Sequence, residues 1–274
     1  MQVDAVQTSS LLPYHLRRIT NLPLKANLIG LILGGRLSPT VMIHSPLKTK
    51  AALVAKHSAA ENAAMIHQYS VASANALWVA YDLARDSRGK PRGITTDPEQ
   101  DILRAMLVAA ASGLDGALKQ LIRDALPTLI GKYDSVHSAF EKFTQKRIQV
   151  GEVDGTSGVS PKILAQILAA PDPQARLVED YVYELTGDSL QSSEQLFKTC
   201  AALGADGQAA IGDAKTLKNV FDARNQIIHE LDMNLDSPNR KRRVRSQKDM
   251  KEYSERLLGI CHDIIHDVDE HLIA

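Results

Sequence analysis

The residue types best suited to chemistry lie in one helical segment in the last quarter of the sequence, residues 213–233. Its apolar side chains recur at the spacing of a single helix face, namely Leu217, Val220, Phe221, Ile228 and Leu231. By the 100° step of an α-helix, Arg224 falls at the centre of that face. Burying a guanidinium without a partner costs on the order of several kcal/mol. We therefore expect Arg224 to be compensated by an internal carboxylate, by an interface or by an anionic ligand.

His229 and Asn225 are the other polar residues of interest in this segment. His229 follows Arg224 by five residues, about 140° further round the helix, so one helix cannot direct both side chains at the same atom. Asn225 precedes His229 by four residues, which places its amide beside the imidazole, where it can orient the ring or fix its tautomer. An imidazole, with an ordinary pKa of about 6.5, suits general acid–base catalysis near neutral pH.

Positive charge is concentrated just after this segment. The whole chain is neutral, with 32 basic and 32 acidic residues, but residues 240–251 carry seven basic residues against Asp249 alone. The basic residues are Arg240, Lys241, Arg242, Arg243, Arg245, Lys248 and Lys251. A basic surface on a neutral chain indicates contact with a polyanion at one place. The alternative interpretation is a solvated start of a helix.

The rest of the chain predicts an all-α protein. Among its 274 residues only 7 Tyr, 4 Phe and 1 Trp are aromatic, and the apolar content comes mainly from Ala and Leu, which favour helices. Prolines and glycines interrupt residues 1–50, which we interpret as an irregular N-terminal extension to a helical domain at residues 51–274. Periodicity and capping residues predict about six helices, at 51–86, 97–127, 173–187, 192–204, 213–233 and 246–272.

The first two of these helices are the longest. In the first, apolar residues recur at spacings of three and four, at Met65, Tyr69, Ala72, Ala76, Val79 and Leu83. The second begins at Asp97-Pro98 and should end at Pro127. Small residues at 109–113 would let another helix approach it closely. Asp115, beside them, is a candidate structural partner for Arg224.

Several common functional classes find no support in the sequence. The glycines of residues 150–161 lack the lysine of a phosphate-binding loop, and we interpret them as a loop. His262 and His266 have the spacing of a helical metal site but no third ligand, so we predict no metal and no cofactor. Cys200 and Cys261 show neither zinc nor disulfide spacing, and the apolar run at 28–33 is too short for a membrane span. These features predict a cytoplasmic protein without a membrane contact.

The segment from Arg224 to His229 reads R-N-Q-I-I-H and matches the R-N-x-x-x-H signature of the HEPN superfamily (higher eukaryotes and prokaryotes nucleotide-binding). Residues 102–108 running into 112–115, then residues 189–194, and then the Arg/His helix resemble in order the RiboL-PSP type of HEPN domain. The resemblance covers residues 97–274, about two-thirds of the chain. It implies an all-helical fold and, as in many members, endoribonuclease activity.

The resemblance also implies a homodimer in which two copies of the Arg/His helix line one cleft, which would bring together the groups that one helix separates. His229 would act as general base and acid in metal-independent RNA cleavage, and Arg224 would stabilise the phosphoryl charge. Asn225 would hold the imidazole or a phosphate oxygen. The basic residues from Arg240 to Lys248 would bind flanking phosphates.

Such families commonly act as toxins or phage-defence effectors, which implies an antitoxin or another regulatory protein as a partner. A second hypothesis is a non-catalytic helical module that binds RNA, a nucleotide or a partner protein. In that case Arg224 would be a neutralised core or interface residue, and His229 would have no chemical role.

Overall fold

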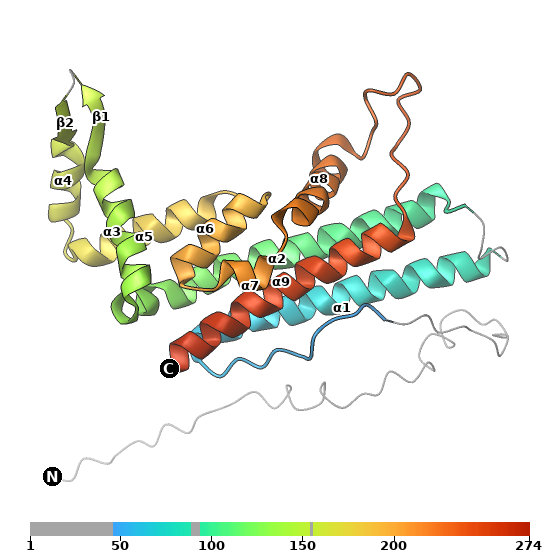
Figure 1. The fold of residues 1–274 in the computed structure, drawn as a ribbon, viewed down its shortest axis with the longest axis horizontal. Coiled ribbons are helices and arrows are strands. Elements are labelled where there is room, and N and C mark those ends of the chain that lie inside the picture. The colour runs from blue at the N-terminus through green and yellow to red at the C-terminus, as the bar shows by residue number, and fades with distance from the viewer. Residues whose placement is uncertain (1–45, 89–93, 154–155) are drawn as a thin grey trace, which may run out of the picture. The chain divides into compact units, whose positions relative to one another are not determined.

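The computed structural model describes residues 46–88, 94–153 and 156–274, which belong to one compact unit, His44–Ala274. Along this described part of the chain, nine helices and one two-stranded hairpin follow one another (Figure 1). The predicted all-α fold class is confirmed, although the helices are more numerous than the six expected. Most of the predicted N-terminal extension, residues 1–45, lies outside the described residues.

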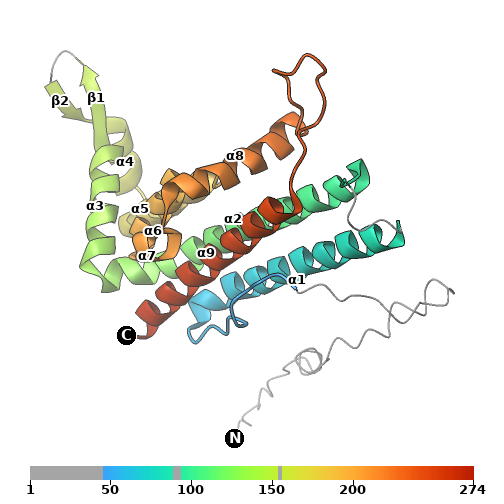
Figure 2. The same ribbon diagram turned by 45° about the vertical axis from the view of Figure 1, so that its right-hand side comes forward.

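Three long helices lie side by side in Figures 1 and 2: α1 (Ser58–Ser87), α2 (Asp97–Lys132) and α9 (Gln247–Ile273). α2 supplies most of the largest fully buried side chains, including Leu103, Met106, Leu107, Leu114, Leu118 and Leu121. α1 approaches α2 closely at Gly113, where an added Cβ would lie 1.9 Å from Ser70 Oγ. By length and composition α2 is the one described helix that could cross a membrane, and 56% of its most apolar window is buried inside the protein.

α2 continues through Pro127 to Lys132, so the predicted end at Pro127 is wrong. A proline in a helix interior lacks one hydrogen-bond donor and costs about 3 kcal/mol. Leu126, Leu129 and Ile130 are nevertheless all buried. The apolar face therefore continues past the proline, and the packing of the last turn offsets the lost hydrogen bond.

α1 begins at Ser58 rather than at Ala51, because residues 46–57 run along α1 and α9 without regular secondary structure. The backbone N–H groups of Lys56 and His57 donate to the buried carboxylate of Asp269, at 2.8 and 2.9 Å. These bonds satisfy backbone donors that a longer helix would have used internally.

The apolar stripe from which the first helix was predicted lies on the exposed side of α1. All six of its members are exposed: Met65, Tyr69, Ala72, Ala76, Val79 and Leu83. The buried side of α1 consists mainly of alanines together with Trp78 and Tyr81, whose rings stack with centroids 5.6 Å apart. Small side chains on the inner face explain how α1 can pack so closely on α2.

Between α2 and α8 the chain forms a smaller group of elements. They are α3 (Asp134–Ile148), the strands β1 (Gln149–Val153) and β2 (Thr156–Val159), α4 (Pro161–Leu168), α5 (Pro173–Gly187), α6 (Ser193–Leu203) and α7 (Gly207–Ile211). The segment predicted as a loop at 150–161 is largely an antiparallel hairpin that pairs Gln149 with Val159. Phe140 and Phe143 of α3 pack on Tyr181 of α5, with centroids 5.8 and 4.7 Å apart, which joins these two helices.

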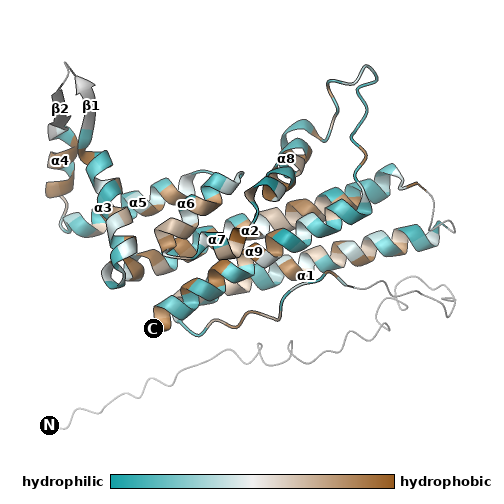
Figure 3. Cartoon of the chain, in the orientation of Figure 1, coloured by the Kyte–Doolittle hydropathy of each residue, from teal (hydrophilic) through white to brown (hydrophobic). Residues whose placement is uncertain are grey.

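α8 (Ala214–Glu230) begins where the sequence predicts, because Asp213 accepts hydrogen bonds from the N–H groups of Lys215 and Thr216. It ends three residues earlier than expected, because Leu231 and Asp232 have positive φ angles of 50° and 60°. Its first half packs on α2 and α6, and a loop after its C-terminal end returns the chain to α9 (Figure 2). Hydrophobic and hydrophilic residues alternate along it (Figure 3).

Candidate active site

Arg224 lies on the inner side of α8, in line with the buried residues Leu217, Val220 and Phe221, and is 9% exposed. Its Nη1 donates to the side-chain oxygen of Asn225 at 2.9 Å. Its Nε is buried and has no hydrogen-bond partner within the described chain. The structure therefore buries this cation but does not satisfy all of its donors.

Asp115 of α2, the predicted partner, makes no ion pair with Arg224 among the described residues. One carboxylate oxygen of Asp115 accepts a hydrogen bond from the Leu190 N–H at 2.7 Å, and the other pairs with Lys119 at 3.0 Å. Burial lowers the pKa of Arg224, and the charge of Asp115 acts in the opposite direction. Asp115 therefore lies close enough to influence the guanidinium, while its own contacts hold it to Lys119 and to the start of the segment before α6.

His229 is exposed, in accordance with its position about 140° round the helix from the buried Arg224. Asn225 does not serve the imidazole in this structure, since its side-chain oxygen accepts from Arg224. The predicted apolar face is not buried along its whole length, because Ile228 is 38% exposed and Leu231 is 71% exposed. The end of α8 thus presents an imidazole among uncovered apolar side chains, where the sequence predicted a continuous buried stripe.

A second polar cluster, which the sequence analysis missed, holds the end of α8 in place. Asp232 is completely buried and accepts a hydrogen bond from Arg104 Nε at 2.8 Å. Arg245 also pairs with both oxygens of this carboxylate, and its Nη2 donates to Gln226 at 2.7 Å. Two arginines from α2 and from the segment before α9 therefore converge on one carboxylate that follows α8 directly.

Burial would raise the pKa of Asp232, but hydrogen bonds from Arg245 and Arg104 hold it below its ordinary value. The carboxylate therefore stays ionised, and its left-handed backbone is held in place from two sides. The sequence contains one indication of this cluster, namely that Arg104 places a cation on the apolar face of α2. The partner could not be identified because Asp232 lies 128 residues away.

The basic segment divides into paired and unpaired cations. Arg242 pairs with Asp101 at 2.6 Å, Arg243 with Glu230 at 2.9 Å and Arg245 with Asp232, so these three help to fix the chain after α8. Arg240 and Lys241 are exposed and make no ion pair with described residues, and Lys248 makes only a distant one, 3.9 Å from Glu252. The charge available to a polyanion is thus smaller than the sequence predicts.

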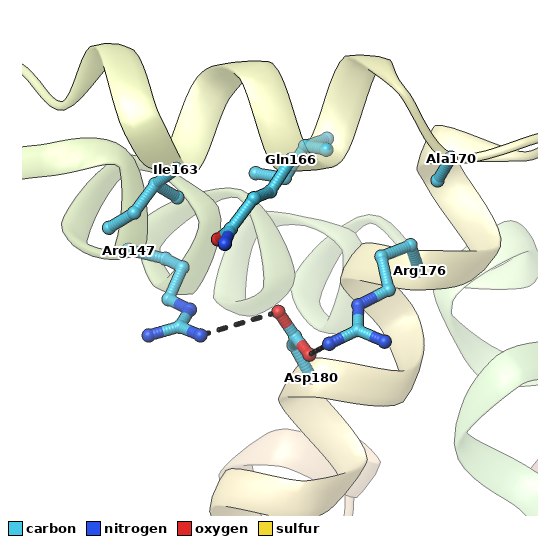
Figure 4. A pocket seen from close by; sticks show the side chains of 7 residues that line it. Arg147, Ile163, Gln166, Ala170, Arg176 and Asp180 are labelled. Carbon is cyan, nitrogen blue, oxygen red and sulfur yellow. Dashed lines mark ion pairs between the residues drawn. The ribbon is translucent and has the colours of Figure 1, made fainter.

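A separate pocket of about 330 Å³ lies between α3, α4 and α5 (Figure 4). Its polar lining consists of Arg147 and Arg176, which both pair with Asp180, at 3.5 and 3.1 Å, and of Gln166. Both arginines are about half exposed, so water screens them. Both arginines are held by the same carboxylate, and we assign the pocket no chemical role.

Comparison with family models, with curated proteins and with solved structures finds no significant match to this chain. Among the described residues no group of three or more His, Cys, Asp or Glu side chains is placed to hold a metal ion.

Proposed function

We propose that the protein is a metal-independent endoribonuclease of the HEPN type that acts as a homodimer. The observation that carries this proposal is the state of Arg224, a buried guanidinium with an unsatisfied Nε and no ion pair within the described chain. Such a group is stabilised when an anion, here an RNA phosphate, reaches it. The exposed His229, one and a half turns further along α8, supplies the acid–base group that phosphodiester cleavage requires.

A homodimer supplies the rest of the site. Arg224 and His229 diverge on one helix, so a phosphate held by one protomer needs an imidazole that comes from the other. Ile228 and Leu231 at the exposed end of α8 are suited to the centre of such a contact, since apolar side chains gain free energy when a partner covers them. Both side chains are exposed and so available to a second copy.

The reaction would proceed as a transesterification. His229 of one protomer removes the proton from a ribose 2′-hydroxyl, and the 2′-oxygen forms a bond to the adjacent phosphorus. The bond from phosphorus to the 5′-oxygen breaks, and His229 of the partner subunit protonates the leaving oxygen. Arg224 stabilises the charge that develops on the phosphoryl oxygens, with Asn225 fixing its planar donor group. The products are a 2′,3′-cyclic phosphate and a 5′-hydroxyl, so DNA is not a substrate.

Flanking phosphates would contact Arg240, Lys241 and Lys248, the members of the basic segment that are not committed to close ion pairs. On this proposal the enzyme acts in the cytoplasm, as a toxin or phage-defence effector under the control of an antitoxin or another regulatory protein. Expression of the wild-type protein should then slow growth of the host, and expression of His229→Ala should not.

The decisive experiment incubates the purified full-length protein with total RNA in excess EDTA. We expect cleavage that persists in the chelator and is lost in both His229→Ala and Arg224→Ala. His137→Ala is the matched control, because His137 is also an exposed helical histidine, on α3. Cleavage by His229→Ala at the wild-type rate would contradict the proposal. If wild type and variants leave RNA intact but bind it equally, the chain is instead a non-catalytic helical module.

A further inference from the structure

The exposed side of α1 has properties that a solvated helix surface does not have. Between Asn62 and Tyr81 the helix contains no Asp, Glu, Lys or Arg. On its outer side Tyr69 is 67% exposed, and Met65, Val79 and Leu83 are each at least 40% exposed. Exposed helix faces of monomeric proteins are normally rich in charged residues, and a continuous apolar face indicates an interaction surface.

The spacing of these residues is that of a helix-pairing seam. Six exposed apolar positions follow one another at intervals of 4, 3, 4, 3 and 4 residues: Met65, Tyr69, Ala72, Ala76, Val79 and Leu83. This is the a/d pattern of a heptad repeat, which keeps one narrow stripe directed at a partner helix. The protein's own core uses a different face of α1, since Ala74, Trp78 and Tyr81 pack inward. The seam is therefore additional to the fold.

The sizes of the seam residues are symmetric about its midpoint. Two large side chains at each end, Met65 and Tyr69 on one side and Val79 and Leu83 on the other, flank the small pair Ala72 and Ala76. When an identical helix is laid antiparallel on this seam, Met65 meets Leu83, Tyr69 meets Val79 and Ala72 meets Ala76. The alanines let the helix axes approach at the centre, and the large side chains fill the space at both ends. The two helix dipoles are then opposed, which is favourable.

We infer that the outer face of α1 is a two-fold interface at which α1 of a second copy of this chain packs antiparallel. The absence of charge along the seam favours an identical partner, because two copies meet there without like-charge repulsion. One edge of the seam is closed by the segment 46–57, where Gln68 donates to the Leu53 carbonyl at 2.7 Å and Asn75 accepts from the Leu47 N–H at 3.1 Å. These bonds fix the segment beside the seam, whose six side chains stay exposed among the described residues.

This interface is distinct from the one proposed for the nuclease. α1 and α8 lie on opposite sides of α2 in both views (Figures 1 and 2), so a protomer can use both faces at once. Two different two-fold contacts on one protomer generate a closed tetramer or a longer assembly, whereas either contact alone gives a dimer. Both contacts can therefore be tested in one set of variants.

The test measures the molar mass of the full-length protein by size-exclusion chromatography with light scattering. We expect Tyr69→Glu/Val79→Glu to reduce the wild-type mass two-fold or more. The matched control is Tyr183→Glu/Leu168→Glu, which places the same charges at exposed apolar helical positions on α5 and α4 and should keep the wild-type mass. Circular dichroism confirms that each variant is folded. A monomeric wild type, or a Tyr69→Glu/Val79→Glu variant with wild-type mass, would overturn the inference.

Cysteine cross-linking tests the orientation, and the two native cysteines do not interfere because both are buried. When Met65→Cys and Leu83→Cys proteins are mixed and oxidised, we expect a disulfide between the two different variants. A disulfide formed by Met65→Cys alone would contradict the antiparallel arrangement. RNA cleavage is assayed in parallel: cleavage with no change of mass in the seam variant would refute only this interface, and a reduced mass in a protein without cleavage would refute only the nuclease.

Discussion

Two arginines occupy apolar helix faces in this protein, and their surroundings differ sharply. Arg104 of α2 is 4% exposed, and its guanidinium donates to Asp232, Asp101 and the Arg243 carbonyl. Arg224 of α8 is buried almost as deeply, but a single amide oxygen accepts from it and its Nε is unsatisfied. The fold supplies several acceptors for the guanidinium of Arg104, which gives it a structural role. Arg224 has an unsatisfied donor within the described chain, and on the proposed function an RNA phosphate satisfies it.

The comparison shows that two similarly buried cations can differ in how far the fold satisfies them. What differs is how many donors the fold satisfies and where the helix carrying them is placed. Arg104 lies on α2, where several partners accept from it, whereas Arg224 lies on α8, where one amide oxygen accepts from it. Natural proteins rarely leave buried donors without an acceptor, and on the proposed function an anionic ligand supplies the acceptor that Arg224 lacks.

The largest expected effect is the loss of stability in Arg104→Ala, which removes one of the two arginines that pair with Asp232. This variant leaves the buried carboxylate of Asp232 with Arg245 as its only cationic partner among the described residues. Removing one member of a buried ion pair typically lowers the free energy of unfolding by about 3–5 kcal/mol. Urea denaturation of the full-length protein measures this decrease. A decrease below about 1 kcal/mol would show that Asp232 does not depend on Arg104.

The corresponding change at the other arginine, Arg224→Met, should separate activity from stability. On the proposed function, removing this donor of transition-state charge stabilisation should reduce the rate of RNA cleavage by about 10²–10³-fold. We expect the free energy of unfolding to stay within about 1 kcal/mol of wild type, because no ion pair is broken and the methionine fits the apolar face. If Arg224→Met were as destabilising as Arg104→Ala, the distinction between the two sites would disappear.

His67 shows a third way to bury an ionisable group, which is to keep it neutral. Burial lowers the pKa of His67 to about 4, with a further lowering from the charge of His262 and an opposing effect from Asp263. Since its pKa in the folded state lies below the unfolded value of about 6.5, the stabilisation is complete above pH 6.5 and is lost as the pH falls toward 4. The shift corresponds to about 3 kcal/mol. In unfolding experiments from pH 7 to 4, His67→Gln should lose less stability than wild type, and an equal loss would contradict this.

The smallest expected effect concerns the unpaired cations of the basic segment. Arg240→Ala/Lys241→Ala should reduce the slope of log K for RNA binding against log salt by about 0.7 for each phosphate that these side chains neutralise in the wild type. Lys198→Ala is the control, because Lys198 pairs with Glu184 on a different surface. An unchanged slope in the double variant would place both side chains outside the RNA-binding surface.

The sequence predicted well those features that depend on local chemistry. Asp213 begins α8 and Ser192 begins α6, each accepting hydrogen bonds from the first turn as expected. The burial of Arg224 followed from the periodicity of its neighbours. The helices α3, α4 and α7 were missed, because such helices are short or weakly patterned and depend on tertiary packing.

Features that depend on distant contacts could not be predicted. The stripe of α1 identified a helix but not its buried side, because alanines make the opposite face apolar as well. The contact between His262 of α9 and His67 of α1, with ring centroids 5.9 Å apart, joins two residues that no local pattern connects. Asp232 belongs to the same class, since its two arginines approach from separate parts of the chain.

On the proposed function, the anchoring of Asp232 also fixes the distance along the RNA between the cleaved bond and a second bound phosphate. The chain after α8 folds back on itself through the bridge between Met233 and Arg242, and Arg243 ties its base to Glu230. Lys241, whose carbonyl accepts from the Asn234 N–H at 2.9 Å, and Arg240 beside it are thereby held at a set separation from His229. On the proposed function, this loop selects substrates by the number of nucleotides between the cleaved bond and the phosphate that Arg240 and Lys241 bind. Oligonucleotides too short to reach both positions would be poor substrates whatever their base sequence.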